Sequence, residues 1–510
     1  MTRYDAIIIG SGIGGLTAGL ALAGKNRSVL LVEASLSYGG YLNPFSRKNF
    51  HFDPGLHYVG QAGEGQDFKT LLDQLDLKEI TFNELSPQGF DWYAFPQYSI
   101  KFGRGIDNFK QQLLKDFPKE KRGINRFFGL MNKVDKIFKT IKTIKSPLQG
   151  IKMLPYVPLG LKYGRATLRD IFDDFTIRDP NLRGVLSGPC GDAGLPPSKL
   201  SGLGHLAILN HYKDGAFYPC GGTTHMMDVM LAKLNKKGAT LINNTRVTRI
   251  LHQSGIVTGV ETETGEQFQS QTVISNAQGV DTYNMIGEPH IKKSLCTKVK
   301  SLENSLGSLV VFLGVADTVD TSRVGDNNVW HYASTDIDGM YQHLLDGGLP
   351  DGRGMFINIP NLKDPAGGRA PKGHHCIEIV TLCSGKPFRK WFDQKVMRRD
   401  EEYKALKEKI SLKLIETAEQ YLPGLSRAIM LKEVSTPATN FAYIHSPDGN
   451  IYGPAVTPGQ VGPFRVSRRG PLKGLFLAGS STDSPGIHPC AVSGKIAGSL
   501  ASQYLDKIIK

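Results

Sequence analysis

The sequence predicts an α/β fold with a doubly wound, Rossmann-like domain and a second, α+β domain. Three observations support this prediction. The 510 residues exceed what one hydrophobic core usually spans, so two domains are expected. An apolar strand at residues 5–9 leads through a glycine-rich turn into a Leu- and Ala-rich helix at 16–23 and a second strand at 28–33. Short alternating strands, separated by polar turns, return at residues 240–275.

The glycine-rich turn Gly10–Gly15 reads GSGIGG and matches the GxGxxG pattern of dinucleotide-binding proteins. Gly10 permits a tight turn, Gly12 lets the backbone approach a pyrophosphate, and Gly15 lets the helix pack closely on the strand. The free N–H groups of the helix then face the phosphates. Glu33 follows Gly10 by 23 residues, where a carboxylate accepts hydrogen bonds from ribose hydroxyls and repels a 2′-phosphate.

The composition indicates a folded, soluble chain. Hydrophobic residues make up 40% and charged residues 21%, and no apolar run reaches the roughly 18 to 20 residues of a membrane-spanning helix. The six cysteines form no CxxC pair, so neither a metal site nor a disulfide framework is predicted. The chain enters its first strand directly after Asp5, without a signal-peptide pattern, and a cytoplasmic location is expected.

The net charge of +14 is unevenly distributed along the chain. Between Lys119 and Lys152 there are ten basic residues and two acids, a local excess of eight. No zinc-finger spacing or RNA-binding signature accompanies this segment, so nucleic acid is not an expected partner. An anionic membrane surface is the expected partner instead.

The pattern at residues 124–145 predicts a basic amphipathic helix within that segment. Its apolar positions recur at helical spacing: Phe127, Leu130, Met131, Val134, Ile137, Phe138, Ile141 and Ile144. Its lysines are Lys133, Lys136, Lys139, Lys142 and Lys145, and Ser146-Pro147 follows as a stop. Such a helix can lie in a membrane interface, with its lysines near anionic headgroups. The alternative is an ordinary helix whose apolar stripe packs on the core and whose lysines are solvated.

Residues 35–60 read SLSYGGYLNPFSRKNFHFDPGLHYVG and resemble the second conserved block of the FAD-containing amine oxidase and phytoene desaturase superfamily. In that block a GG pair follows the ribose-binding acid, as Gly39-Gly40 does here, and residues 52–55 resemble its FDxG element. The resemblance implies that the dinucleotide is FAD. Many members carry an arginine after the GG pair, where this chain has Tyr41, so a phosphate contact from that position is lost.

Three further stretches resemble the retinol saturases, their bacterial phytoene-dehydrogenase-like relatives and the carotenoid isomerases. They are HYVG at 57–60, GDAGLPP at 191–197 and GAFYPCGG at 215–222. Residues 475–501 resemble the superfamily's closing strand and helix, which contact the flavin and its phosphates. Within them, TDSPGIHP at 482–489 departs from the THPG of carotenoid desaturases, which argues against a strict desaturase. The resemblance spans the whole chain.

The resemblance implies an FAD-binding domain built from separated segments, with the substrate domain interleaved between them. We expect the FAD-binding domain at 1–61, 215–289 and 466–510, and the substrate domain at 62–214 and 290–465. The residues expected to contact FAD are Gly10, Gly12, Ile13, Gly14, Gly15, Glu33, Ala34, Gly39, Gly40, Tyr41, Val247, Gly479, Ser480, Asp483, His488, Pro489 and Val492. By similarity, Val247 lies against the adenine.

Four side chains are candidates for catalysis. Saturation of a C=C bond requires hydride from the flavin and a proton for the other carbon. His57 and Tyr58 follow the FAD-binding block, and Asp192 lies in the GDAGLPP element, so each is a candidate proton donor. The alternative is that all three are structural, because they lie beside turns. By resemblance, His488 lies where the closing segment passes the isoalloxazine ring.

The sequence therefore predicts an FAD-dependent oxidoreductase that acts on C=C bonds of a long apolar polyene or related lipid, first of all a retinol-saturase-like reductase. Carotenoid cis-trans isomerisation and phytoene-type desaturation are alternatives with the same fold and substrate class. An amine or porphyrinogen oxidase and a flavin-free prenyl-binding escort protein are further alternatives. No second GxGxxG unit is visible, so the electron donor is unknown. We expect a cytoplasmic protein that associates peripherally with membranes.

Overall fold

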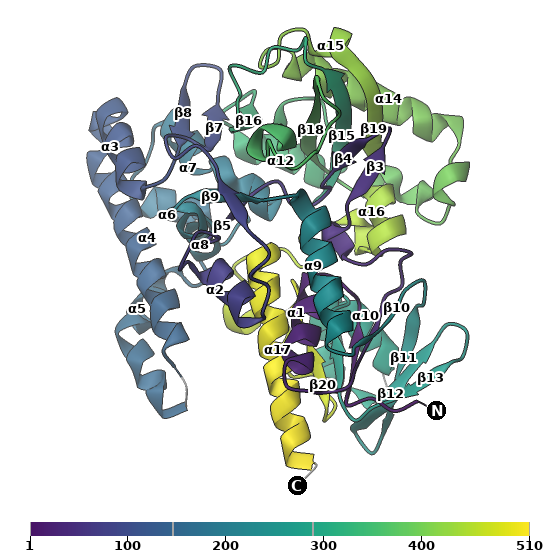
Figure 1. Ribbon diagram of the computed structural model, residues 1–510. Helices are drawn as coiled ribbons and strands as arrows, with labels where there is room; N and C mark the ends of the chain where they lie inside the picture. The colour runs from purple at the N-terminus through teal and green to yellow at the C-terminus, as the bar shows by residue number, and fades with distance from the viewer. Residues whose placement is uncertain (1, 145–146, 288–289, 509–510) are drawn as a thin grey trace.

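A five-stranded parallel sheet lies at the centre of one part of the molecule (Figure 1). The computed structural model describes residues 2–144, 147–287 and 290–508. The sheet has the order β10-β2-β1-β14-β20, and every neighbouring pair is parallel. Its strands are β1 (Ala6–Ile9), β2 (Val29–Val32), β10 (Thr240–Ile242), β14 (Val273–Ser275) and β20 (Leu475–Leu477). Segments far apart in the sequence thus form a single sheet.

The two faces of the parallel sheet follow from the alternation of side chains along its strands. Ala6 and Ile8 of β1 pack against helices, whereas Ile7 and Ile9 pack against a small antiparallel sheet. The helices are α1 (Ile13–Ala23), α9 (Gly222–Lys236) and α17 (Ile487–Ile508). The antiparallel sheet consists of β11 (Val247–Gln253), β12 (Ile256–Thr262) and β13 (Gln267–Gln269). The predicted α/β class is confirmed, with this small sheet on the second face.

Helices α1 and α17 run side by side along the sheet (Figure 1). A Cβ atom on Gly494 of α17 would lie 2.0 Å from the carbonyl oxygen of Gly14 and 2.2 Å from Thr17 Oγ1. The Thr17 hydroxyl donates a hydrogen bond to the carbonyl of Ala491 at 3.0 Å. Only glycine permits this approach, which fixes the start of α1 relative to the C-terminal helix.

A seven-stranded sheet organises the second part, in the order β19-β15-β18-β17-β16-β7-β8. Its neighbours are antiparallel except β16 and β7. The strands are β7 (Asp91–Ala94), β8 (Ser99–Phe102), β15 (Gly307–Ala316), β16 (Asn328–Tyr332), β17 (Gly354–Asn358), β18 (His374–Cys383) and β19 (Ile429–Ser435). Val329 on one face joins the core beneath α14 (Glu401–Ala418) and α15 (Leu425–Ala428), whereas Trp330 and Phe356 face a separate core.

A group of helices from residues 106–212 packs on that separate core and forms the outer edge at the left of Figure 1. They are α3 (Ile106–Asp116), α4 (Lys121–Lys142), α5 (Val157–Tyr163), α6 (Leu168–Asp174), α7 (Pro180–Leu186) and α8 (Gly202–Tyr212). The predicted helix 124–145 corresponds to α4, while Lys145 and Ser146 lie outside the described residues. None of the described helices has the length and apolar character required to cross a membrane.

Small elements join the two parts. Strands β5 (Val59–Gly60), β9 (Ala216–Pro219) and β6 (Phe82–Glu84) form a three-stranded sheet, and β3 (Phe45–Arg47) pairs with β4 (Phe50–Phe52). The remaining α-helices of the described residues are α2 (Asp67–Gln74), α10 (Gly279–Ile286), α11 (Lys293–Lys300), α12 (Ile337–Leu345), α13 (Pro360–Lys363) and α16 (Pro437–Ile444).

Every strand of the parallel sheet lies within the segments predicted for the FAD-binding domain, 1–61, 215–289 and 466–510. The domain boundaries themselves stay predictions.

Replacement of Gly494 by alanine should destabilise the protein by roughly 1–3 kcal/mol, because the added methyl group overpacks the contact between α1 and α17. Gly129→Ala on α4 is the matched control, since no atom lies within 4 Å of its added Cβ. We expect a lower thermal midpoint for Gly494→Ala and an equal or higher one for Gly129→Ala. Equal midpoints for the two variants would contradict the close helix contact.

Candidate active site

One elongated cavity of about 650 Å³ connects the two parts of the molecule. It begins at the glycine-rich turn around Gly12, passes Tyr41 and Tyr452, and reaches Phe356 on the seven-stranded sheet. Cofactor and substrate sites commonly have volumes of about 300–1,000 Å³. The cavity is therefore the candidate active site.

The first part of the cavity is suited to phosphate groups. Gly12 caps α1 without a side-chain hydrogen bond, and no acidic residue lies in the first turn of the helix. Cβ atoms on Gly12 and Gly14 would lie 2.8 and 2.4 Å from the side-chain amide of Asn276. A Cβ on Gly15 would lie 2.0 Å from the Gly10 carbonyl oxygen, so Gly15 serves close packing and does not line the cavity. Bare N–H groups at a helix N-terminus are suited to bind a pyrophosphate.

Glu33 lies at the end of β2 and lines the cavity together with Ala34. Its carboxylate accepts hydrogen bonds from the Ser11 N–H at 2.8 Å, the Ser11 hydroxyl at 2.5 Å and the Ser35 N–H at 2.8 Å. The Ser11 hydroxyl oxygen in turn accepts from the Gly39 N–H at 2.9 Å. A carboxylate held in this way at the cavity wall is suited to ribose hydroxyls.

Val247 begins β11 and also lines the cavity, and its contact with the adenine stays a prediction. Polar and apolar neighbours that sequence reasoning did not name line the same end: Thr245, Arg246, Thr248, Asp281 and Met285. An apolar side chain between polar neighbours suits a flat base with hydrogen-bonding edges.

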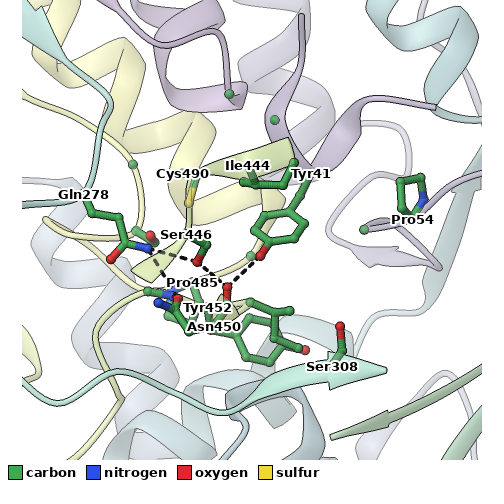
Figure 2. A pocket seen from close by; sticks show the side chains of 18 of the residues that line it. Tyr41, Pro54, Gln278, Ser308, Ile444, Ser446, Asn450, Tyr452, Pro485 and Cys490 are labelled. Carbon is green, nitrogen blue, oxygen red and sulfur yellow. Dashed lines mark hydrogen bonds between the residues drawn. The ribbon is translucent and has the colours of Figure 1, made fainter. Parts of the chain in front are cut away.

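Tyr41 lies in the middle of the cavity wall, where Figure 2 shows its hydroxyl directed at Asn450. The hydroxyl donates to the Asn450 carbonyl oxygen at 2.6 Å, and the Ser446 hydroxyl donates to the same oxygen at 2.5 Å. The Gln278 amide donates to Asn450 Oδ1 at 3.4 Å. Burial raises the pKa of Tyr41, which keeps the hydroxyl neutral. Asn450 therefore connects its own segment with those of Tyr41 and Gln278. Gly39 and Gly40, which precede Tyr41, also line the cavity, and both have a positive φ.

The closing segment after β20 contributes only some of its predicted residues. Gly479 and Ser480 line the cavity. Asp483 does not; it accepts a hydrogen bond from Arg468 Nε at 2.9 Å and holds the loop in place.

His488, Pro489 and Val492 of α17 also lie outside the cavity lining. The His488 ring packs between Phe68 and His211, with ring centroids 5.3 and 5.5 Å away. Burial lowers the pKa of His488 to about 4, so the imidazole is neutral near pH 7. This geometry does not support direct proton transfer from His488. The residues of this turn that do line the cavity are Pro485, Gly486, Ile487 and Cys490.

The other three catalytic candidates, His57, Tyr58 and Asp192, line the same cavity. The Tyr58 ring stacks on Tyr212, with centroids 4.8 Å apart and planes at 24°. A Cβ on Gly191, beside Asp192, would lie 2.4 Å from the Trp330 ring, so the GDAG element must bring its backbone against an aromatic wall. That wall is formed by Trp330, Tyr332, Tyr341 and Phe356.

The acid at this end of the cavity is held neutral. Burial raises the pKa of Asp192 well above its usual range, and the nearby Asp91 raises it further. Within the described part of the chain, Asp192 Oδ2 has no hydrogen-bond partner. The Tyr58 hydroxyl donates to Asp91 Oδ2 at 3.2 Å, and burial raises the pKa of Asp91 to about 6. A neutral carboxyl facing an apolar cavity can act as a general acid.

Buried polar side chains hold both the ring and the backbone carbonyl of His57 in place. Its Nδ1 lies 2.9 Å from Glu378 Oε2, and the Asn358 amide donates to the same oxygen at 2.8 Å. Lys363 Nζ donates to the His57 carbonyl oxygen at 2.9 Å and to Asn328 Oδ1 at 2.5 Å. Burial lowers the pKa of Lys363 to about 7.

Sequence reasoning missed several residues that support the site. A charged residue inside an apolar strand could have pointed to Glu378 in β18 and Asp91 in β7, because such a group needs a buried partner. Asn276 and Asn450 carry no such signal, since their role depends on segments that meet only in the folded chain. No cluster of three potential metal ligands was found among the residues described by the structure.

The parallel sheet, the glycine-rich turn and the buried acid at the far end of one cavity define a two-domain, dinucleotide-dependent oxidoreductase. The sequence model of the family described as flavin containing amine oxidoreductase matches residues 13–498, and the chain belongs to this family. The cofactor is therefore FAD, as the sequence predicted.

The relatives agree with this assignment. An all-trans-retinol 13,14-reductase from Danio rerio is 26% identical over 97% of this chain and 84% of its own length. A chloroplastic prolycopene isomerase from an Oncidium hybrid is 28% identical over 96% of this chain and 82% of its own. The solved structure of putrescine oxidase has a TM-score of 0.67 at 13% identity and covers 100% of this chain and 99% of its own, so it shares the fold.

The residues of the first part of the cavity fit FAD. The bare turn at Gly12 and Gly14 would hold the pyrophosphate, Glu33 the ribose, and Val247 the adenine. When bound, FAD supplies hydride-transfer chemistry. The polypeptide supplies binding, orientation and the groups that handle protons.

Replacement of Glu33 by glutamine should weaken FAD binding about tenfold, or roughly 1.4 kcal/mol, because the amide cannot accept all the hydrogen bonds that the carboxylate holds. Flavin fluorescence quenching on titration of the apoprotein measures this affinity. Glu266→Gln, in an exposed turn, is the matched control and should bind FAD normally. Unchanged affinity in Glu33→Gln would contradict the ribose assignment.

Proposed function

We propose that this FAD-dependent oxidoreductase saturates a C=C bond in a long apolar polyene or related lipid. One observation carries the proposal: the neutral carboxyl of Asp192 faces an aromatic cavity that is continuous with the dinucleotide site. Saturation of an unactivated double bond needs a hydride and a proton on neighbouring carbons. An apolar cavity with a single protonated acid suits that requirement.

The chemistry divides between cofactor and polypeptide. When bound and reduced, FAD would supply the hydride. Asp192 gives its proton to the second carbon, so that one C=C π bond is replaced by two C–H bonds. Tyr58, stacked on Tyr212, orients Asp192 and keeps water from that side of the substrate. The wall at Trp330 and Phe356 binds the flat polyene by apolar contact.

Isomerisation is the second candidate, because one group of relatives carries the name prolycopene isomerase. It would use the same cavity, but its net reaction consumes neither hydride nor proton. Desaturation would run the hydride transfer in reverse. An amine oxidase is less well supported, since its polar substrate would gain little from the aromatic lining. The electron donor stays unassigned.

Anaerobic incubation of the reduced holoenzyme with polyenes in D₂O tests the proposal. A reductase gives a product heavier by two added hydrogens, both as deuterium, because the N–H of reduced flavin and the carboxyl proton both exchange with D₂O. Asp192→Asn should lower the rate by about 10²–10⁴-fold, because the amide cannot protonate carbon. Asp107→Asn, on the exposed face of α3, should react normally. A product of unchanged mass would indicate isomerisation, and full activity of Asp192→Asn would remove it as the acid.

We further propose that the segment from the end of α4 to α5 contacts an anionic membrane surface. Seven of the fourteen large apolar side chains exposed in the described residues lie between positions 138 and 161: Phe138, Ile141, Leu148, Ile151, Leu154, Val157 and Leu161. The start of the apolar stripe is different, because Phe127 and Met131 are buried in the core. Lysines at 133, 136, 139, 142, 152 and 162 flank the exposed set.

This arrangement combines both features of an interfacial segment, an apolar surface and neighbouring positive charge. The first half of the apolar stripe, with Phe127 and Met131, therefore packs on the core as an ordinary helix would. The second half, with Phe138 and Ile141, is exposed on the surface. None of these residues lines the cavity, so the segment would hold the protein at the membrane rather than form the substrate passage.

Simultaneous replacement of Leu148, Ile151, Leu154 and Leu161 by serine should weaken binding to phosphatidylglycerol-containing vesicles at least about tenfold, through loss of buried apolar area. Vesicle co-sedimentation measures the binding. Met397→Ser, at a side chain that is 92% exposed elsewhere, is the matched control and should bind normally. Absence of vesicle binding by the unaltered protein would end the membrane proposal.

A further inference from the structure

Four acidic side chains lie between the segment 53–58 and the seven-stranded sheet. Asp53, Asp91 and Glu378 are buried, and Asp192 is half-buried on the cavity wall. Each ionised carboxylate in such a place requires a positive partner or several hydrogen bonds, since its desolvation is otherwise not compensated. Their partners therefore determine which of the four carries a proton.

Two of the carboxylates have basic partners of their own. Arg369 Nη2 lies 2.6 Å from Asp53 Oδ1. His57 Nδ1 lies 2.9 Å from Glu378 Oε2. Neither pair includes the acids nearest to the aromatic wall.

Of the remaining two carboxyls in the described residues, Asp91 has a cation nearby and Asp192 does not. Lys363 Nζ donates to Asn328 Oδ1 at 2.5 Å, and the Asn328 amide donates to Asp91 Oδ1 at 2.8 Å. Lys363 is thus linked to Asp91 through a single side chain. Asp192 has no basic partner in the described residues; it interacts with the Tyr58 hydroxyl, which also donates to Asp91.

We propose that Lys363 is a positioning residue: it keeps Asp91 ionised and thereby leaves the one proton shared by the two carboxyls on Asp192. This inference rests on the proposed reductase function for its purpose, but the arrangement itself does not depend on substrate. Asp91, as the ionised member, accepts the Tyr58 hydrogen bond. The Tyr58 oxygen is then free to accept one from the protonated Asp192, because a hydroxyl both donates and accepts.

The other titratable groups around the two carboxyls do not change this assignment. Tyr93 lies beside Asp91, and Tyr212, Tyr341 and Tyr452 lie beside Asp192; burial raises the pKa of all four, so they stay neutral. Glu378 and Asp326 face Lys363 and favour its charged form. Asp91 and Asp192 lie on either side of the Tyr58 hydroxyl, and the two carboxyl groups repel each other when both are ionised.

The proton balance of one turnover follows directly. The O–H bond of Asp192 breaks as a C–H bond forms on the substrate, and Asp192 becomes a carboxylate. It then stands beside the ionised Asp91 without a cation of its own. The repulsion drives its reprotonation from water that enters the cavity after the product leaves.

Infrared spectroscopy of the FAD-loaded, substrate-free protein at pH 6.5, below the Lys363 pKa of about 7, tests the inference through the carbonyl band of protonated carboxyls. We expect one such band in the unaltered protein, absent from Asp192→Asn. Lys363→Met should produce a second band, because Asp91 then binds a proton, and Lys363→Met combined with Asp91→Asn should lose that second band. Lys233→Met, which removes an ion pair with the exposed Asp76 outside the cavity lining, should not produce it.

Asp91→Asn alone provides an independent measurement if Lys363→Met does not fold. Without the negative charge of Asp91, the Asp192 band should disappear at lower pH than in the unaltered protein. No second band in Lys363→Met, or an unshifted Asp192 band in Asp91→Asn, would overturn the role of Lys363. These spectra need no turnover, so they stand apart from the product-mass experiment that tests the reductase function.

Discussion

The buried carboxylate of Asp53 holds the two parts of the molecule together. It lies 2.6 Å from Arg369 and accepts hydrogen bonds from the hydroxyls of Thr223, at 2.6 Å, and Tyr218. An isolated carboxylate in this place would cost several kcal/mol, and that cost is offset only when β9, α9 and the loop before β18 are all in position. Gly222 is part of the same constraint, because a Cβ there would lie 2.3 Å from Arg369. The parallel sheet and the seven-stranded sheet must therefore meet for this charge to be satisfied.

The position of His57 and Tyr58 follows from this interaction. His57 and Tyr58 lie four and five residues after Asp53, so a chain fixed at Asp53 delivers them to the cavity wall. Glu378 strengthens the placement, because it binds His57 and also accepts the Asp53 N–H at 3.2 Å. Aromatic rings then hold Tyr58 between Tyr212 and the sheet. These side chains of the cavity wall are thus held in place by the protein itself, an arrangement that lowers reorganisation if they act in catalysis as proposed.

The sequence predicted best those features that depend on residues close together in the chain. The glycine-rich turn and Glu33 belong to one strand–helix–strand unit, and local pattern alone identified them. Lys363 could not be found in this way, because it approaches Asp91 only after distant strands have paired. For His488, the motif correctly located the segment beside the cavity but not the direction of the side chain. Successive residues of a helix differ by about 100° in direction. Ile487 consequently lines the cavity, whereas His488 packs against Phe68.

Asp91 and Lys363 also reduce the stability of the fold. The penalty from Asp91 grows as pH rises, and the penalty from Lys363 grows as pH falls. Burial raises the pKa of Asp91 from 3.8 to about 6, so the native chain binds more protons than the unfolded chain there, and stability falls as pH rises through that range. Burial lowers the pKa of Lys363 from 10.5 to about 7, so the native chain binds fewer protons, and stability falls as pH drops from 10.5 towards 7. Both penalties are present between about pH 6 and 7. The satisfied contacts of Asp53 and the close packing of α1 on α17 contribute stability that offsets these penalties.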